Sequence, residues 1–237
     1  MKKMMILAIV LMILFGFLGL MQDMNDLQNG MIRLHVVGAS DSQEDQNVKL
    51  MVKDAVNYYL ARELTEAKDT DQALQMIRTR LPELKDIAEQ ILREHGFSER
   101  VDITLEKECF PRREYDTFSL PSGVYTALRI RIGDATGRNW WCVVFPTLCI
   151  PAAGEDFQST AAGAGFSDSL TNTLSGQEEY ELRFFFLDLL GQVQNFFNCL
   201  FAFLWIMVKK IHEIVGMSYI SKPSGFHCFN HIVFHDG

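Results

Sequence analysis

The stretch IRLHVVGASDSQEDQNVKLMVKDAVNYYL (residues 32–60) decides the fold, because its hydrophobic period changes once along its length. Apolar and polar side chains alternate from Ile32 to Val36, which predicts a half-buried strand. The turn GASDS (residues 38–42) breaks the alternation, and its last two residues are placed to cap a helix. Apolar residues then recur at helical spacing as far as Leu60, so one strand and one amphipathic helix are predicted.

A second amphipathic helix is predicted from Asp69 to His95. Its apolar residues lie alternately three and four positions apart, and Gly96 supplies a left-handed stop. Pro82 lies inside this pattern. Because proline lacks an amide proton and crowds the preceding turn, we expect a kink or a restart of the helix there.

Three further strands are predicted at residues 101–106, 128–132 and 140–145. The loop at residues 133–139 is rich in residues that accept positive φ, which favours an antiparallel hairpin between the last two strands. The strand at 140–145 is apolar almost throughout, which is typical of a central strand. The order of elements predicts an α+β fold, a two-layer sandwich in which two helices cover one face of a roughly four-stranded sheet.

The N-terminal segment indicates export. Lys2 and Lys3 precede an uninterrupted apolar run from Met4 to Met21, and polar residues follow it. The run has about the length of a membrane span, for which roughly 20 residues are typical. We therefore expect a signal peptide or signal anchor in residues 1–30, with a globular domain in residues 31–150 on the far side of a membrane. No Ala-x-Ala pattern follows the run, so cleavage and membrane retention both stay open.

The second half of the chain changes in composition. Residues 151–178 are mostly small and polar, which predicts a flexible linker. Residues 179–210 are strongly apolar, and this segment either docks on the domain or contacts a membrane. Residues 211–237 form a tail for which the pattern predicts no structure.

Several classes of function are disfavoured. The formal net charge of −8 argues against nucleic-acid binding, which needs a cationic surface. His35, Ser40 and Asp41 have the residue types of a hydrolase triad, but no nucleophile elbow accompanies them. Three histidines four residues apart near the end resemble a zinc site, but that stretch does not favour helix; they are His227, His231 and His235. We therefore predict no catalytic residue, no metal site and no cofactor.

The cysteines leave two readings open. Cys142 and Cys149 flank Pro146, so a turn there would bring their sulfur atoms together in an exported domain. We expect a disulfide between them, and the alternative is two free cysteines that act as small buried hydrophobic residues. A thiol-dependent enzyme would need an accessible thiolate of low pKa.

Several separated motifs resemble the stage II sporulation protein R family of endospore-forming bacteria. They are residues 32–46 and 49–56, LPEL (81–84), LPSGVY (120–125) and NWWCVVFPTLC (139–149), with a weaker echo at 179–190. The resemblance covers about residues 31–150. It implies an exported protein that acts in the space between the forespore and mother-cell membranes. There, family members are thought to activate a membrane-embedded aspartic protease of the mother cell that processes the sigma-E precursor.

The residues expected to contact this partner lie at one end of the sheet and in the loop at 112–123. Our hypothesis names Asn139, Trp140, Trp141, Pro146 and Tyr115, because aromatic residues are enriched in binding hot spots. Adjacent strand residues point to opposite faces, so we expect one tryptophan to lie in the core and the other to be available to a partner. A thiol-dependent extracytoplasmic enzyme and a structural, membrane-tethered envelope protein remain as alternatives.

Overall fold

The computed structural model describes residues 2–115, 117–148, 157–176 and 181–215, with only the backbone described for residues 209–215. Its centre is a mixed four-stranded sheet in the order β2-β5-β1-β6. The strands are β1 (Ile32–Val37), β2 (Val101–Phe110), β5 (Gly123–Ile132) and β6 (Asn139–Phe145). A two-stranded ladder joins β3 (Arg113–Glu114) and β4 (Ser119–Leu120). The α+β class predicted from the sequence is confirmed.

The topology differs from the predicted hairpin. Strand β1 lies between β5 and β6, parallel to β5 and antiparallel to β6. The loop after β5 therefore crosses the end of β1, and Gly137 N donates to Gly38 O at 3.1 Å. A Cβ at Gly137 would lie 2.1 Å from Ser40 O, so this crossing requires a glycine. The glycine-containing loop that suggested a hairpin therefore makes a close crossing instead. Strand β6 lies at an edge of the four-stranded sheet, so the prediction of a central strand there is wrong.

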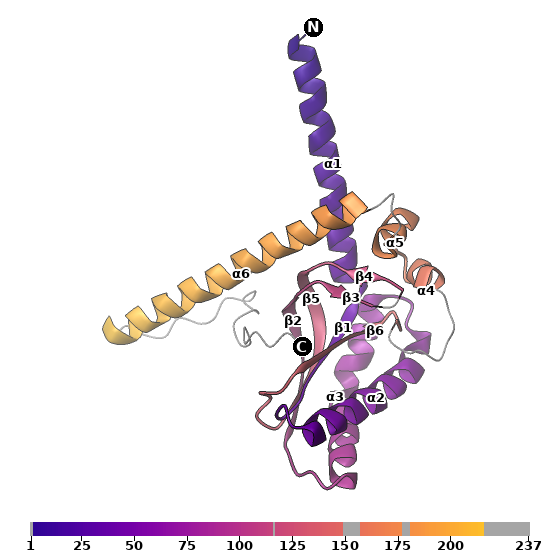
Figure 1. Ribbon diagram of the computed structural model, residues 1–237, viewed down its shortest axis with the longest axis vertical. Coiled ribbons are helices and arrows are strands. Elements are labelled where there is room, and N and C mark those ends of the chain that lie inside the picture. Colours follow the sequence, from indigo (N-terminus) through magenta and orange to yellow (C-terminus); the bar gives the residue numbers. More distant parts are fainter. Residues whose placement is uncertain (1, 116, 149–156, 177–180, 216–237) are drawn as a thin grey trace.

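One face of the sheet is covered by two helices, α2 (Gln43–Glu63) and α3 (Thr70–Glu94), joined by a short 3-10 turn, η1 (Leu64–Glu66) (Figure 1). Ser42 caps α2 by accepting a hydrogen bond from Asp45 N, and Asp69 caps α3 by accepting one from Gln72 N. Helix α3 continues through Pro82, so the helix does not restart there, and the alternative of a kink stays a prediction. The side chains packed between helices and sheet are mostly aliphatic.

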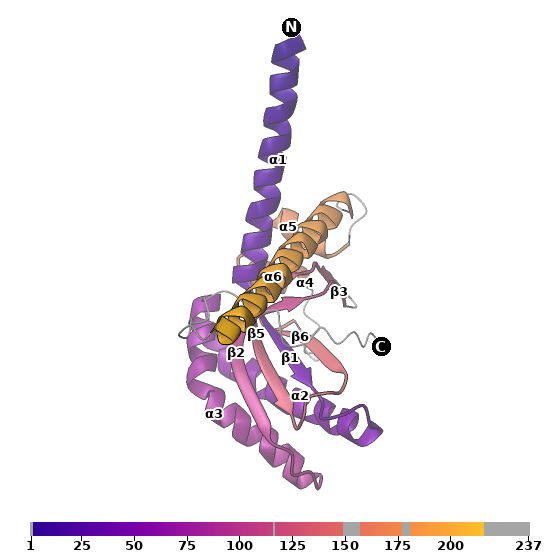
Figure 2. The ribbon, with the colours of Figure 1, turned by 90° about the vertical axis from the view of Figure 1, so that its left-hand side faces the viewer.

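The opposite face of the sheet is covered by elements from both ends of the chain: the last turns of α1 (Lys2–Gly30), α4 (Phe157–Gly163), α5 (Asp168–Leu174) and the first half of α6 (Glu181–Val215). Phe157, Leu170 and Leu174 are buried in this second core. The flexible linker predicted at 151–178 is therefore wrong for residues 157–174, because a few well-spaced apolar residues suffice to pack two short helices. Figure 2 shows α6 and α3 on different sides of the sheet.

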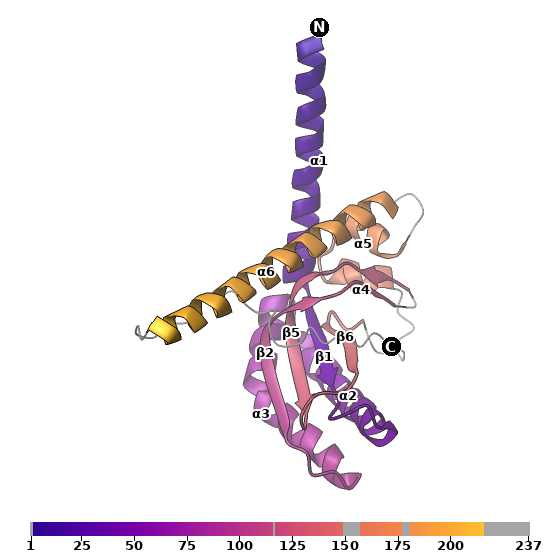
Figure 3. The same ribbon diagram turned by 60° about the vertical axis from the view of Figure 1, so that its left-hand side comes forward.

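Two long apolar helices extend from this body. Residues 2–19 of α1 are exposed and project away from the domain, whereas Met24 and Leu27 are buried against it (Figure 1). Helix α6 passes the base of α1 and continues beyond the β2 edge of the sheet (Figures 1 and 3). Both helices are long and apolar enough to cross a membrane.

Candidate functional site

The polar residues of β1 are buried, although the alternation of the sequence predicts that they face solvent. All six residues of β1 are buried, and Arg33 and His35 point to the face opposite α2 and α3, among the aromatic residues of the second core. Two buried ionisable side chains on adjacent same-face positions require local partners, because an isolated charge in the interior is costly. Their partners define the candidate site.

His35 is held by two hydrogen bonds and one stacked ring. Its Nδ1 donates to Glu108 Oε1 at 2.8 Å, and its Nε2 lies 2.8 Å from Asn139 Oδ1. The Trp141 ring stacks on the imidazole with the ring centroids 3.9 Å apart. An imidazole nitrogen can donate to an amide oxygen or accept from an amide nitrogen, so Nε2 bonds Asn139 in either orientation of that amide. In either state, His35 fixes the positions of Asn139 and Trp141.

Arg33 holds the second group of predicted site residues. It is fully buried, and its guanidinium lies 4.0 Å from the Phe110 ring centroid and 5.0 Å from that of Tyr125. Its Nη2 donates to Tyr115 Oη at 3.0 Å, and the Tyr115 ring stacks on Phe118. Among the described residues, Nε and Nη1 of Arg33 have no hydrogen-bond partner. Burial raises the pKa of the Tyr125 phenol, which therefore stays neutral beside this cation.

A second arginine extends the polar group along the sheet. Arg129 on β5 lies 3.6 Å from Glu106 and 3.9 Å from Glu108, which also binds His35. The Arg113 guanidinium lies 5.6 Å from the Trp141 ring. The site is therefore a network of cations, carboxylates and aromatic rings, an arrangement that orients side chains.

The structure divides the predicted docking residues between two faces of the sheet. Asn139, Trp141 and Tyr115 come together through His35 and Arg33. Trp140 points to the helix-covered face, where it is 37% exposed and lies 4.6 Å from Lys53 Nζ of α2. Pro146 follows a cis peptide bond and is buried, so its side chain is not an exposed contact.

The cysteines are placed only in part. Cys142 is 3% exposed, and both Cys142 and Cys109 are disulfide-bonded. They lie on β6 and β2, with β5 and β1 between them, so they are too far apart to be bonded to each other. Cys149 lies outside the described residues, and its bond to Cys142 stays a prediction.

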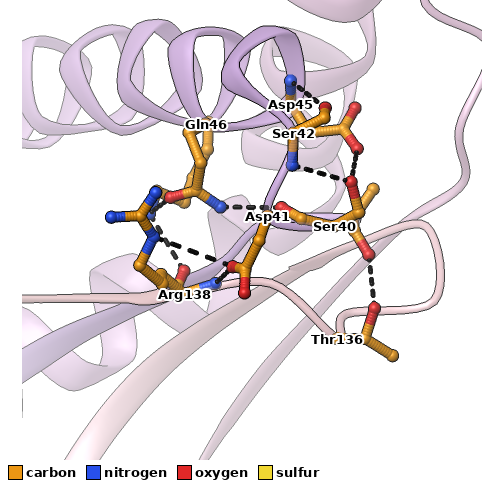
Figure 4. Close-up of polar contacts among 9 residues, drawn as sticks. Ser40, Asp41, Ser42, Asp45, Gln46, Thr136 and Arg138 are labelled. Carbon is orange, nitrogen blue, oxygen red and sulfur yellow. Dashed lines mark hydrogen bonds and ion pairs between the residues drawn. The ribbon is translucent and has the colours of Figure 1, made fainter. Parts of the chain in front are cut away.

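The residues weighed as a hydrolase triad do not assemble. Ser40 and Asp41 brace the turn between β1 and α2, where Asp41 Oδ1 accepts from Arg138 N at 2.7 Å (Figure 4). Lys49 Nζ donates to Arg138 O at 2.9 Å, and burial lowers the pKa of this lysine. His35 is bonded to Glu108 and Asn139 instead. This polar cluster fastens the loop at 133–138 to the start of α2.

Metal binding finds no support in the part of the chain that the structure describes. There, no group of three histidine, cysteine or acidic side chains is arranged to hold an ion. The three histidines at positions 227, 231 and 235 lie outside that part.

The sequence hypothesis named Asn139, Trp141 and Tyr115 but not Arg33, and it considered His35 only as a member of a hydrolase triad; Arg33 and His35 are the residues that join the other three. Their positions in an alternating strand are typical of side chains in solvent. The available signal was the apolar content of the segment after residue 156, which provides the cover for the second face.

Comparison with known proteins places the chain in a family. Residues 28–155, which are 128 of 237 residues, match the family described as stage II sporulation protein R (spore_II_R). A curated relative named stage II sporulation protein R, from Bacillus subtilis (strain 168), is 36% identical over 118 residues. That alignment covers 50% of this chain and 53% of the relative, so the chain spans about half the length of this relative. No solved structure matches. The chain belongs to the stage II sporulation protein R family.

Proposed function

We propose that this protein is an exported sporulation signal, held at a membrane by α1, that activates a membrane-embedded aspartic protease of the mother cell by binding to it. The activated protease then processes the sigma-E precursor. The observation that carries the proposal is the combination of family membership with an apolar N-terminal helix joined to a folded domain. The domain acts by recognition and catalyses no reaction itself.

Membrane attachment is supported by the dimensions and exposure of α1. The apolar run at residues 4–21 has 18 residues, which as a helix extend about 27 Å, close to the thickness of a bilayer core. The most apolar window of α1 is 0% buried within the protein. Because Met24 and Leu27 are buried in the domain, the helix leads directly into the folded body.

The direction of β1 supports recognition across a gap. One residue, Met31, separates the end of α1 from the start of β1, and β1 runs away from α1. The last residue of β1, Val37, pairs with Asn139. Six strand residues extend about 20 Å. Asn139 and Trp140 therefore lie at the end of the sheet that is far from α1, where a partner in an opposite membrane can reach them.

The enzyme alternative has little support at Cys142. A catalytic thiolate must be accessible and free, whereas Cys142 is 3% exposed and disulfide-bonded. A structural envelope protein remains the alternative of a different class, because it would also need an anchor and a stable domain.

Deleting the gene in the sporulating host and restoring it with a plasmid copy tests the proposal. We expect the sigma-factor precursor to remain uncleaved in the deletion strain and cleavage to return with the plasmid, as measured by immunoblotting of precursor and product. A copy retained in the cytosol by removal of residues 1–21 serves as control and should not restore cleavage. Normal cleavage in the deletion strain would contradict the proposal and favour a structural role.

A further inference from the structure

Helix α6 has its polar residues turned toward the domain. Asp188 Oδ1 accepts from both Ser122 N and Ser122 Oγ at 2.8 Å. Asn195 Nδ2 donates to Phe110 O at 3.1 Å. The helix also approaches the domain closely, because a Cβ at Gly191 would lie 1.6 Å from Ser122 O. This side of α6 is fixed by directional contacts.

Two further polar contacts join α6 to the base of α1. Arg183 Nε donates to Asp23 Oδ2 at 2.9 Å, and Gln28 Nε2 donates to Gln194 Oε1 at 2.6 Å. Asp23 and Gln28 are both buried. The point where α1 leaves the domain is therefore also the point where α6 crosses it, as Figures 1 and 3 show.

The outward face of α6 is apolar. Between residues 182 and 208, every exposed side chain except Gln192 is hydrophobic. The exposed set is Leu182, Phe185, Phe186, Leu189, Val193, Phe196, Phe197, Leu200, Phe201, Phe203, Leu204, Ile206, Met207 and Val208. A surface helix in water shows the opposite pattern, with its apolar stripe toward the core and its polar face outside. An apolar face of this size is unfavourable in water and indicates a binding surface.

We propose that the outward face of α6 lies in the surface of the same lipid bilayer that α1 enters. The inference rests on the anchoring by α1 proposed above. The far part of α6 projects beyond the sheet and is apolar around most of its circumference, so it needs cover on several sides, as lipid provides. A protein interface would in general add a polar rim, and no charged side chain interrupts the exposed face from Leu182 to Val208.

The contacts at residues 183–195 place α6 along the membrane surface. Because this half of the helix is bonded to the domain, it cannot enter the bilayer core without breaking those bonds. A helix with one apolar face at a bilayer lies with that face buried about 5–10 Å below the headgroups. Together, α1 and α6 would hold the domain in one orientation, with Asn139 and Trp140 directed away from the membrane.

Photocrosslinking of the full chain in phosphatidylethanolamine–phosphatidylglycerol vesicles tests this inference. The crosslinker p-benzoylphenylalanine replaces one residue at a time: Phe185 or Phe196 on α6, Phe15 on α1, or Tyr58 on α2. These replacements are similar in shape to the native rings, and Tyr58 is the control because it is an exposed aromatic residue, 72% accessible, on the helix-covered side of the sheet. Intact mass after irradiation identifies a phospholipid adduct or a crosslinked second copy.

We expect phospholipid adducts at Phe15, Phe185 and Phe196, each at least about tenfold above the yield at Tyr58. Adducts at Phe15 with none at Phe185 and Phe196, or crosslinks from these two to a second copy, would overturn the inference and leave the anchor in place. Adducts on α6 with none at Phe15 would place α6 in lipid but contradict anchoring by α1, and would therefore overturn the inference that both helices share one bilayer. The absence of adducts at all three positions would refute both.

Discussion

On the helix-covered face of the sheet, β1 presents Ile32, Leu34 and Val36, which pack against the aliphatic residues of α2 and α3. On the opposite face, the alternate positions carry Arg33 and His35, which pack against Phe110, Trp141 and charged side chains. The two faces are about equally buried but differ in chemistry. Aliphatic packing stabilises the fold but does not depend strongly on orientation, whereas hydrogen-bonded and stacked groups hold side chains in particular orientations.

This difference suggests a division of work. The helix-covered face supplies most of the stability. On the opposite face, buried charges lower the stability but position Asn139, Trp141 and Tyr115. In some proteins costly buried polar groups fix one particular arrangement, although replacing them with apolar residues is often neutral or stabilising. Variants that change stability and signalling separately can therefore test the comparison.

The largest loss of stability is expected for Leu84→Ala on the helix-covered face. Leu84 is fully buried in the aliphatic core, so its truncation should lower the free energy of unfolding by about 2–5 kcal/mol. Urea denaturation measures the effect, and Met51→Ala on the exposed side of α2 should stay within about 0.5 kcal/mol. Precursor cleavage should fall only as far as the amount of folded protein falls. A greater loss of cleavage at equal protein level would assign recognition to this face too.

On the opposite face, Trp141→Ala should cost about 3 kcal/mol, since it removes the ring stacked on His35 and packed against Phe110. Trp141→Phe keeps a stacked ring and should cost about half as much or less. If Trp141→Ala unfolds at the same urea concentration as the native protein, the aromatic stack contributes no stability, and the comparison of the two faces fails there.

How far the fold could be predicted differs between the same two faces. Periodicity identified α2, α3 and all four long strands, because Leu34, Leu84 and Ile130 repeat at the spacing of the element that contains them. Strand order could not be derived, since the glycine-rich loop at 133–138 is as compatible with a two-residue reversal as with a crossing over β1. The close approach of Gly137 to Ser40 distinguishes the two, and it is a long-range contact that the sequence does not show.

Part of the candidate site could be named from the sequence, but its buried charged residues could not. Asn139 and Trp141 are conspicuous in the sequence, whereas Arg33 and His35 have the pattern of solvent-facing residues until the second face is known to be covered. That cover depends on Phe157 and Leu170, in a stretch whose composition predicts a linker. Packing of this distant segment therefore buries side chains that the local alternation assigns to solvent.

Arg33→Met is expected to separate stability from signalling. Because two of the guanidinium nitrogens have no partner among the described residues, a methionine of similar length should change the free energy of unfolding by less than about 1.5 kcal/mol, in either direction. Cleavage of the precursor should nevertheless fall, since Tyr115 loses its hydrogen bond. Arg78→Met on the exposed side of α3 is the control for loss of charge. Normal cleavage with Arg33→Met would show that the buried cation does not position a recognition surface.

The smallest effect on stability and the sharpest test of recognition is expected for Trp140→Ala. Trp140 is 37% exposed and its main described contact is with Lys53, a type of cation–π contact worth about 0.5–1 kcal/mol at exposed sites. The variant should therefore unfold almost as the native protein does. If Trp140 is a binding hot spot, however, truncation costs at least about 2 kcal/mol of affinity, and cleavage should fall about tenfold or more at limiting protein.

Tyr58→Ala is the matched control for Trp140→Ala, because Tyr58 is another exposed aromatic residue on the same side of the sheet, on α2. Immunoblotting of precursor and product at equal expression compares the two variants. A selective loss of cleavage with Trp140→Ala would place one recognition residue on the helix-covered face, at the end of the sheet far from α1. The two faces would then differ in role only through their buried residues. Equal cleavage in both variants would remove Trp140 from the docking surface and leave the cluster around His35 as its remaining candidate.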